Sequence, residues 1–159
     1  GAKSKGIRTG MASDWLLNDP FEIMRVMLSA TRLKAGDYKA LSSYEALELA
    51  TAGAADVVGL GDCIGRLKVG YDADIIAVAL DRPHMQPFYG TATSLVWHAR
   101  ASDVTDSWVK GKPVLAKGEV DGIDESDALN AFATRLNHLG EMIRGLGGIT
   151  RTDPCQCCA

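Results

Sequence analysis

An aspartate that follows a short apolar segment is the residue of this sequence best suited to chemistry. Residues 7–13 read Ile-Arg-Thr-Gly-Met-Ala-Ser, which predicts a short buried strand, and Asp14 comes directly after it. A carboxylate at a strand end can ligate a metal ion, or accept a proton as a general base and return it as a general acid. Aspartate also caps turns, so the pattern alone leaves both a catalytic and a structural role open for Asp14.

Other metal-ligating side chains are few and scattered. We expect His84 in a loop, at the surface or in packing, His98 in a strand, and His138 solvated on a helix. Cys63 is isolated, and three further cysteines crowd the chain end without a second ligand pair, at Cys155, Cys157 and Cys158. A catalytic zinc ion uses about three protein ligands, so these residues do not form a recognisable site.

The composition excludes several classes of protein. The 159 residues carry a net charge of -3 without a dense Lys/Arg stripe, so we expect no nucleic-acid binding. No apolar run approaches the roughly 20 residues that span a bilayer, and the first residues lack the apolar core of a signal peptide. We therefore expect no membrane association and a cytoplasmic location with free thiols. With 47% hydrophobic residues, the chain can bury a core.

Several motifs of other enzyme classes are absent. The sequence has no G-x-S-x-G nucleophile elbow, no Walker-type phosphate loop and no G-x-G-x-x-G after a predicted strand. The run Gly145-Leu146-Gly147-Gly148 follows a predicted helix rather than opening one, so we interpret it as a helix stop.

Capping signals predict two helices in the first part of the chain. Asp19 can cap a helix whose first position is Pro20, and apolar side chains follow at helical spacing up to Gly36. The sequence Ser42-Ser43-Tyr44-Glu45 is a capping box, which predicts a second helix that ends near Gly59.

A β-rich stretch and one further helix are expected next. Strands are predicted over residues 73–80, 94–99 and 104–109, and Gly111-Lys112 predicts a hairpin turn. The last helix is predicted to start near Asp124. Its apolar side chains repeat at alternating steps of three and four, at Leu129, Phe132, Leu136, Leu139 and Ile143.

Many fixed spacings resemble one enzyme superfamily. Residues 45–74 are similar to the part of amidohydrolase-superfamily enzymes that joins the last barrel helices to the C-terminal strands. The matching residues are Glu45-Ala46-Leu47, Ala50-Thr51, Gly59-Leu60, Ile64-Gly65-Arg66-Leu67, Gly70 and Ala73-Asp74. Residues 10–14 and 18–25 resemble the end of the eighth barrel strand in one branch of this superfamily. That branch holds aminohydrolases and chlorohydrolases that act on purines, triazines, cytosine or adenosyl compounds.

The resemblance implies a fragment of a larger α/β fold. In the family, a (β/α)8 barrel carries the metal site, and both chain ends build a small β-sandwich. A barrel takes about 250 residues, with about 200 as the minimum, so this chain cannot hold one. The resemblance implies the last strand and helices of a TIM barrel in residues 1–60 and the C-terminal part of the composite β-sandwich in residues 61–120. A C-terminal helix in residues 121–147 and a flexible tail in residues 148–159 complete this division.

The resemblance also gives Asp14 a role. In the family, the aspartate at the end of strand eight ligates the catalytic metal, takes a proton from the metal-bound water and passes it to the leaving group. One divalent ion, zinc or iron, is implied, which lowers the pKa of its water to about 7. Trp15 is expected to wall the substrate pocket or to pack, and Asn18 to bind an exocyclic group. The family's H-x-H pair is absent here, so the metal site is expected to be incomplete.

These expectations define a function and an alternative to it. The chain is expected to belong to a hydrolase of carbon–nitrogen (or carbon–chlorine) bonds other than peptide bonds, which deaminates a small nitrogen heterocycle as a homo-oligomer. The chain alone is expected to be inactive. The alternative is a non-catalytic α+β domain that binds partners through strand edges or its last helix, or a decayed fragment. An H-x-H motif upstream in the gene would favour the enzyme.

Overall fold

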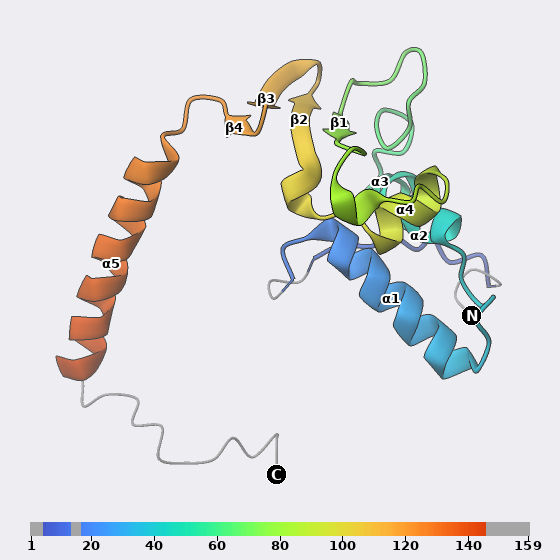
Figure 1. Cartoon of the computed structure of the whole chain (residues 1–159), viewed down its shortest axis with the longest axis horizontal. Helices are drawn as coiled ribbons and strands as arrows, with labels where there is room; N and C mark the ends of the chain where they lie inside the picture. Colours follow the sequence, from blue (N-terminus) through green and yellow to red (C-terminus); the bar gives the residue numbers. More distant parts are fainter. Residues whose placement is uncertain (1–4, 14–16, 146–159) are drawn as a thin grey trace, which may run out of the picture. The chain divides into compact units, whose positions relative to one another are not determined.

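The computed structural model describes residues 5–13 and 17–145. The chain divides into two compact units, with the boundary between Asp121 and Gly122. Figure 1 shows the first unit with α1 beside α2 and α4, and with the strands β1 to β4. The described part of the second unit contains the helix α5.

The first helix, α1 (Pro20–Ala35), begins and ends where the capping signals predict. The Asp19 carboxylate accepts hydrogen bonds from the backbone N–H groups of Phe21 at 2.8 Å and Glu22 at 3.4 Å. Gly36 ends the helix with φ 62°, a left-handed conformation that suits glycine because it has no Cβ. Both predicted ends of this helix are confirmed.

The second predicted helix is two helices in the structure. Ser42 and Glu45 form the predicted capping box and open α2 (Ser43–Ala50). The backbone leaves the helical conformation at Thr51, with φ -118° and ψ -90°, and α3 (Ala52–Val57) follows. The capping box is therefore confirmed, whereas the break at Thr51 was not predicted.

One predicted strand is wrong, because residues 94–99 lie mostly in a helix. α4 (Thr91–Trp97) has a helical hydrogen bond from His98 N to Ser94 O at 2.9 Å, and Ser94, Val96 and Ala99 are buried. Seven residues are too few for hydrophobic periodicity to distinguish a helix from a buried strand.

The core lies between α1, α2 and α4. The apolar face of α1 is covered within this chain. Its side chains are buried against α2, α4 and Met85, with exposures of 5% for Phe21, 2% for Met24 and 0% for Leu28. Part of this covering surface is α4, a segment that we did not predict as a helix. Arg25 of α1 fixes this contact by donating to the carbonyl of Ala99 at 2.7 Å.

The four strands form one antiparallel sheet in the order β1-β2-β3-β4. They are β1 (Ile75–Val78), β2 (Val104–Val109), β3 (Lys112–Ala116) and β4 (Glu119–Val120). Lys110 and Gly111, with φ 51° and 76°, make the turn between β2 and β3, and Val109 pairs with Lys112. The predicted hairpin is confirmed, with its turn one residue earlier than the predicted Gly111-Lys112. The strand predicted over residues 104–109 is confirmed, and the one predicted over residues 73–80 is present but shorter, over Ile75–Val78. Short 3-10 turns, η2 (Pro83–Met85) and η3 (Ala101–Asp103), precede α4 and β2.

The predicted strand over residues 7–13 is absent from the structure. This segment forms no ladder with β1 to β4, and the Ile7 side chain is 56% exposed rather than buried. A strand needs a neighbour for its N–H and C=O groups. Among the described residues, the segment instead crosses the junction of α2 and α3.

The second unit is described by the helix α5 (Glu125–Gly145), which begins close to the predicted Asp124. None of its residues is buried, and its stripe of apolar side chains is exposed, with Leu129 at 67% and Phe132 at 60%. No helix among the described residues is both long and apolar enough to cross a bilayer.

Candidate functional site

Asp14 was predicted to ligate the metal ion, and Trp15 to wall the substrate pocket or to pack. Both residues lie outside the described residues. Their neighbours Ser13 and Asn18 are described, and both are exposed. Asn18 directly precedes Asp19, the cap of α1. The structure thus describes how the chain is held on the two sides of residues 14–16.

Upstream of Asp14, the backbone is held by the junction of α2 and α3. The backbone N–H of Met11 donates to the carbonyl of Leu49 at 2.9 Å. The guanidinium of Arg8 donates to the carbonyl of Asp56, near the end of α3, at 3.3 Å. Met11 also packs against the core cluster. Residues 8–11 are therefore held against α2 and α3 although they form no sheet.

Downstream of Asp14, Asp19 joins two distant parts of the chain. One carboxylate oxygen caps α1, and the other accepts a hydrogen bond from the backbone N–H of Ala101 at 2.9 Å. Ala101 opens η3, directly before β2. The start of α1 is thereby tied to the turn that leads into the sheet.

The described histidines do not meet at a common site. His84 Nε2 lies 2.8 Å from Oδ2 of Asp103, a buried carboxylate that also accepts from the backbone N–H of Arg100 at 2.9 Å. His98 is the C-cap of α4, so its predicted place in a strand is wrong, and its ring lies 6.0 Å from that of Tyr89. His138 is exposed on α5, as predicted.

The pairing of His84 with Asp103 is the contact that sequence reasoning missed. We expected His84 at the surface or in packing, and nothing in the sequence linked it to a residue 19 positions later. Burial acts to raise the pKa of the Asp103 carboxyl, but the hydrogen bonds from His84 and from the Arg100 N–H lower it by more. The pKa of Asp103 therefore lies below its usual value, and the carboxylate stays charged.

The described side chains do not by themselves fit a catalytic metal ion. Residues 5–13 and 17–145 contain no group of three His, Cys, Asp or Glu placed to hold one. Cys63 is a free, exposed thiol, and Cys155, Cys157 and Cys158 lie outside the described residues.

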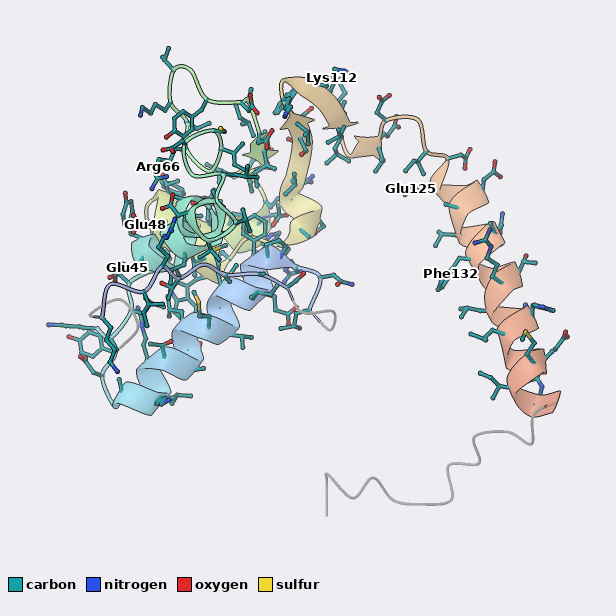
Figure 2. All side chains as sticks on the ribbon, turned by 180° about the vertical axis from the view of Figure 1, so that it is seen from behind. Glu45, Glu48, Arg66, Lys112, Glu125 and Phe132 are labelled. Atoms are coloured by element: carbon teal, nitrogen blue, oxygen red, sulfur yellow. The ribbon has the colours of Figure 1, made fainter. Side chains whose placement is uncertain are left out.

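Two hollows lie in the first unit. A small one of about 210 Å³ is lined by residues 7–9 and by Glu48, Asp56 and Arg66, and Figure 2 shows Glu48 and Arg66 on the same side of the unit. Arg66 donates to Asp56 at 3.4 Å, which raises the pKa of the guanidinium. A larger groove of about 920 Å³ is mostly apolar and includes Leu47, Ile64 and Leu95. Among the residues that the structure describes, no histidine or cysteine lines either hollow.

The sequence matches a known family over most of its length. Residues 1–114 match the model of the amidohydrolase family. The chain belongs to this family. The resemblance seen in the motifs of residues 45–74 is thereby confirmed.

Among curated relatives, the chain is similar to proteins named 5-methylthioadenosine/S-adenosylhomocysteine deaminase. It is 34% identical over 128 residues to the enzyme of Syntrophomonas wolfei, covering 78% of this amidohydrolase chain and 30% of that protein. It is 39% identical over 128 residues to the enzyme of Bacillus thuringiensis strain Al Hakam, covering 76% and 28%. The chain thus spans less than a third of the length of these relatives.

Solved structures share the fold. An adenosine deaminase from Xanthomonas campestris with bound zinc superposes with a TM-score of 0.72 at 34% identity, covering 79% of this chain and 28% of that one. Atrazine chlorohydrolase from Arthrobacter aurescens TC1, complexed with zinc, gives a TM-score of 0.73 at 21% identity, covering 83% and 30%. The mixed α/β architecture with an open four-stranded sheet is therefore the architecture of amidohydrolases over this region.

Proposed function

We propose that this chain is the C-terminal part of a metal-dependent amidohydrolase that hydrolyses a carbon–nitrogen bond and deaminates a nitrogen heterocycle. The observation that carries the proposal is the family match over residues 1–114. Identities of 34% to a deaminase sequence and to a zinc-bound adenosine deaminase structure support it.

We propose a division of the chain that agrees with this function. Residues 1–60 supply the last strand and helices of the (β/α)8 barrel, residues 61–120 the C-terminal part of the β-sandwich, residues 121–147 a helix and residues 148–159 a tail. The relatives are more than three times as long as the aligned region, which leaves room for the remainder of a barrel of about 250 residues. Residues 7–13 form no strand here because their sheet partners belong to that remainder.

In this enzyme Asp14 is the residue that handles the proton. It follows the segment anchored through Met11. Its carboxylate would be a ligand of the metal ion and would accept a proton from the attacking water and deliver it to the leaving amine. A bound divalent ion supplies a water of lowered pKa. We propose zinc rather than iron, because the similar adenosine deaminase structure, at 34% identity, contains zinc. The histidine ligands come from segments of the barrel that this chain does not span.

The substrate class follows from the relatives. Deaminases of 5-methylthioadenosine, S-adenosylhomocysteine and adenosine all act on an adenine ring that carries a ribose. We therefore propose an adenine nucleoside as substrate, with Trp15 against the ring and Asn18 near an exocyclic group. The likeness to the chlorohydrolase, at 21% identity, is a likeness of fold.

The experiment is an assay of the natural protein that contains these residues. The zinc-loaded protein is incubated with adenosine, 5-methylthioadenosine and a chlorotriazine, and ammonia and chloride are measured separately. Ammonia released from the nucleosides supports the proposal. Release of chloride alone would assign a chlorohydrolase, and no release from any substrate would favour a non-catalytic domain.

A further inference from the structure

We infer that the junction of α2 and α3 anchors the segment that leads to Asp14, and that Gly10 and Gly53 are positioning residues of the enzyme. This inference rests on the proposed function, because it assumes that Asp14 acts in catalysis. The contacts that carry it lie within residues 8–11 and 48–56, all of which the structure describes.

The break in the helix provides the hydrogen-bond acceptor. In an unbroken α-helix, the carbonyl of Leu49 would accept from the N–H four residues later, that of Gly53. The backbone turns away from helical geometry at Thr51, and the Leu49 carbonyl accepts from Met11 N at 2.9 Å. The Thr51 hydroxyl donates to the carbonyl of Leu47 at 2.8 Å, so a second carbonyl beside the break is also satisfied. The break between α2 and α3 therefore leaves the Leu49 carbonyl available to bind a segment that is remote in the sequence.

Two glycines allow the backbones to approach. A Cβ atom at Gly10 would lie 2.6 Å from Cα of Ala54 and 2.9 Å from the carbonyl oxygen of Gly53. A Cβ atom at Gly53 would lie 2.8 Å from the carbonyl oxygen of Thr9. All these neighbours are backbone atoms, which cannot rotate away as a side chain can. The absence of a side chain at both positions is therefore what permits the contact.

The contact extends along consecutive residues. Arg8 donates to the carbonyl of Asp56 at 3.3 Å, Thr9 faces Gly53, Gly10 faces Ala54, and Met11 donates to Leu49. Met11 also packs on the core. Asp14 is only three residues beyond Met11, and an extended chain gains at most about 3.6 Å per residue. If an added methyl group displaces residues 8–11, only three residues therefore separate the displaced segment from Asp14.

Such a shift affects catalysis more than folding. Catalytic side chains must be held within about 0.5 Å of their productive position, and a misplacement of about 1 Å can cost 100-fold in rate. The Gly10→Ala variant must open the contact with α3. We expect kcat to fall by about 10- to 100-fold with a smaller change in KM, and zinc to bind about 10-fold more weakly.

The experiment compares Gly10→Ala and Gly53→Ala with Gly140→Ala in the natural protein that contains these residues. Gly140 lies within α5, and a Cβ there would meet only the side chain of Arg144, at 3.9 Å. This variant should keep the wild-type zinc affinity, kcat and KM, and its melting temperature should not fall, because alanine is favoured over glycine inside a helix. Zinc affinity is measured by competition with a chelator, kcat and KM with the nucleoside, and the melting temperature by calorimetry. Hydrogen exchange of the Met11 amide in the wild-type protein needs no variant, and fast exchange there would overturn the anchor even if a variant does not fold.

The outcomes separate this inference from the proposed function. Weakened zinc binding and a reduced kcat in variants that still melt cooperatively, with a slowly exchanging Met11 amide, support the anchor. Wild-type zinc affinity and kcat in both variants, or a Met11 amide that exchanges at the rate of an unprotected peptide, would overturn it. If the wild-type protein deaminates nothing, the proposed function fails, while zinc affinity and amide exchange still decide whether the anchor exists.

Discussion

Asp103 is buried with 2% exposure, and its Oδ2 lies 2.8 Å from Nε2 of His84. The pair ties η2 to η3, two turns on either side of α4. The same carboxylate oxygen accepts from the Arg100 backbone N–H at 2.9 Å. A buried carboxylate that accepts two hydrogen bonds is a stabilising group only while it is charged.

This pair predicts a dependence of stability on pH. Because the pKa of Asp103 is lowered in the folded protein, its contribution is fully present above the unfolded value, near 3.9, and is lost as the pH falls through the folded value. The Asp103→Asn variant should lower the free energy of unfolding by about 2 kcal/mol at pH 7. The difference from wild type should shrink below about pH 4.

Urea denaturation of the natural protein between pH 3 and pH 7 measures this difference. Asp81→Asn, at an exposed aspartate, is the matched control and should stay within about 0.5 kcal/mol of wild type throughout. A difference for Asp103→Asn that is independent of pH would show that packing rather than charge is lost.

Asp19 is predicted to stabilise the first unit through two separate interactions. Its carboxylate caps α1 through Phe21 and bridges to Ala101 of η3. Asp19→Ala removes both interactions and should cost about 2 kcal/mol, whereas Asp19→Ser keeps the cap, loses the bridge and should cost about half as much. Chemical denaturation compares the two variants. Equal losses in both would mean that the bridge to η3 contributes nothing measurable.

The parts of the fold that sequence reasoning predicted are those set by neighbouring residues. Asp19 and Ser42 cap helices through N–H groups within three residues of themselves. The turn at Lys110 and Gly111 also depends on its own backbone. Such signals act over a few positions, so they can be recognised in the sequence before the tertiary contacts are known.

The parts that could not be predicted depend on distant partners. The helix α4 is short, and its burial against α1, with Arg25 donating to Ala99 74 positions away, is what distinguishes it from a strand. Residues 7–13 have the composition of a strand but no strand beside them among the described residues. The pairing of His84 with Asp103 likewise joins two turns that only the fold brings together.

Asp14 remains the residue on which activity is predicted to depend. In the natural protein, Asp14→Asn keeps the size of the side chain but removes its charge and basicity, so kcat should fall at least ~100-fold. The chain of 159 residues alone should show no turnover of nucleosides above a zinc-only blank, because its described residues provide no three-ligand metal site. Ammonia release measures both. A near-normal rate with normal metal content in Asp14→Asn would show that the residue is structural.

The chain of 159 residues, taken alone, is predicted to self-associate. On α5, no residue is buried, and the apolar side chains at spacings of three and four are exposed, with Leu129 at 67%, Phe132 at 60%, and Leu136 and Leu139 at 49% each. The first unit adds an apolar groove of about 920 Å³. Contiguous apolar surface of this kind is rarely left in water by a soluble monomer.

Light scattering across a wide concentration range tests this prediction. We expect the mean mass to rise with concentration, and the double variant Phe132→Lys with Leu136→Lys to lower the association, because charges on the stripe oppose its burial. Asn137→Lys introduces a charge on the same helix without touching the apolar stripe, so it should leave the association nearly unchanged. A monomer at every concentration, with a sharp cooperative melt, would mean that the chain covers its own apolar surface in solution.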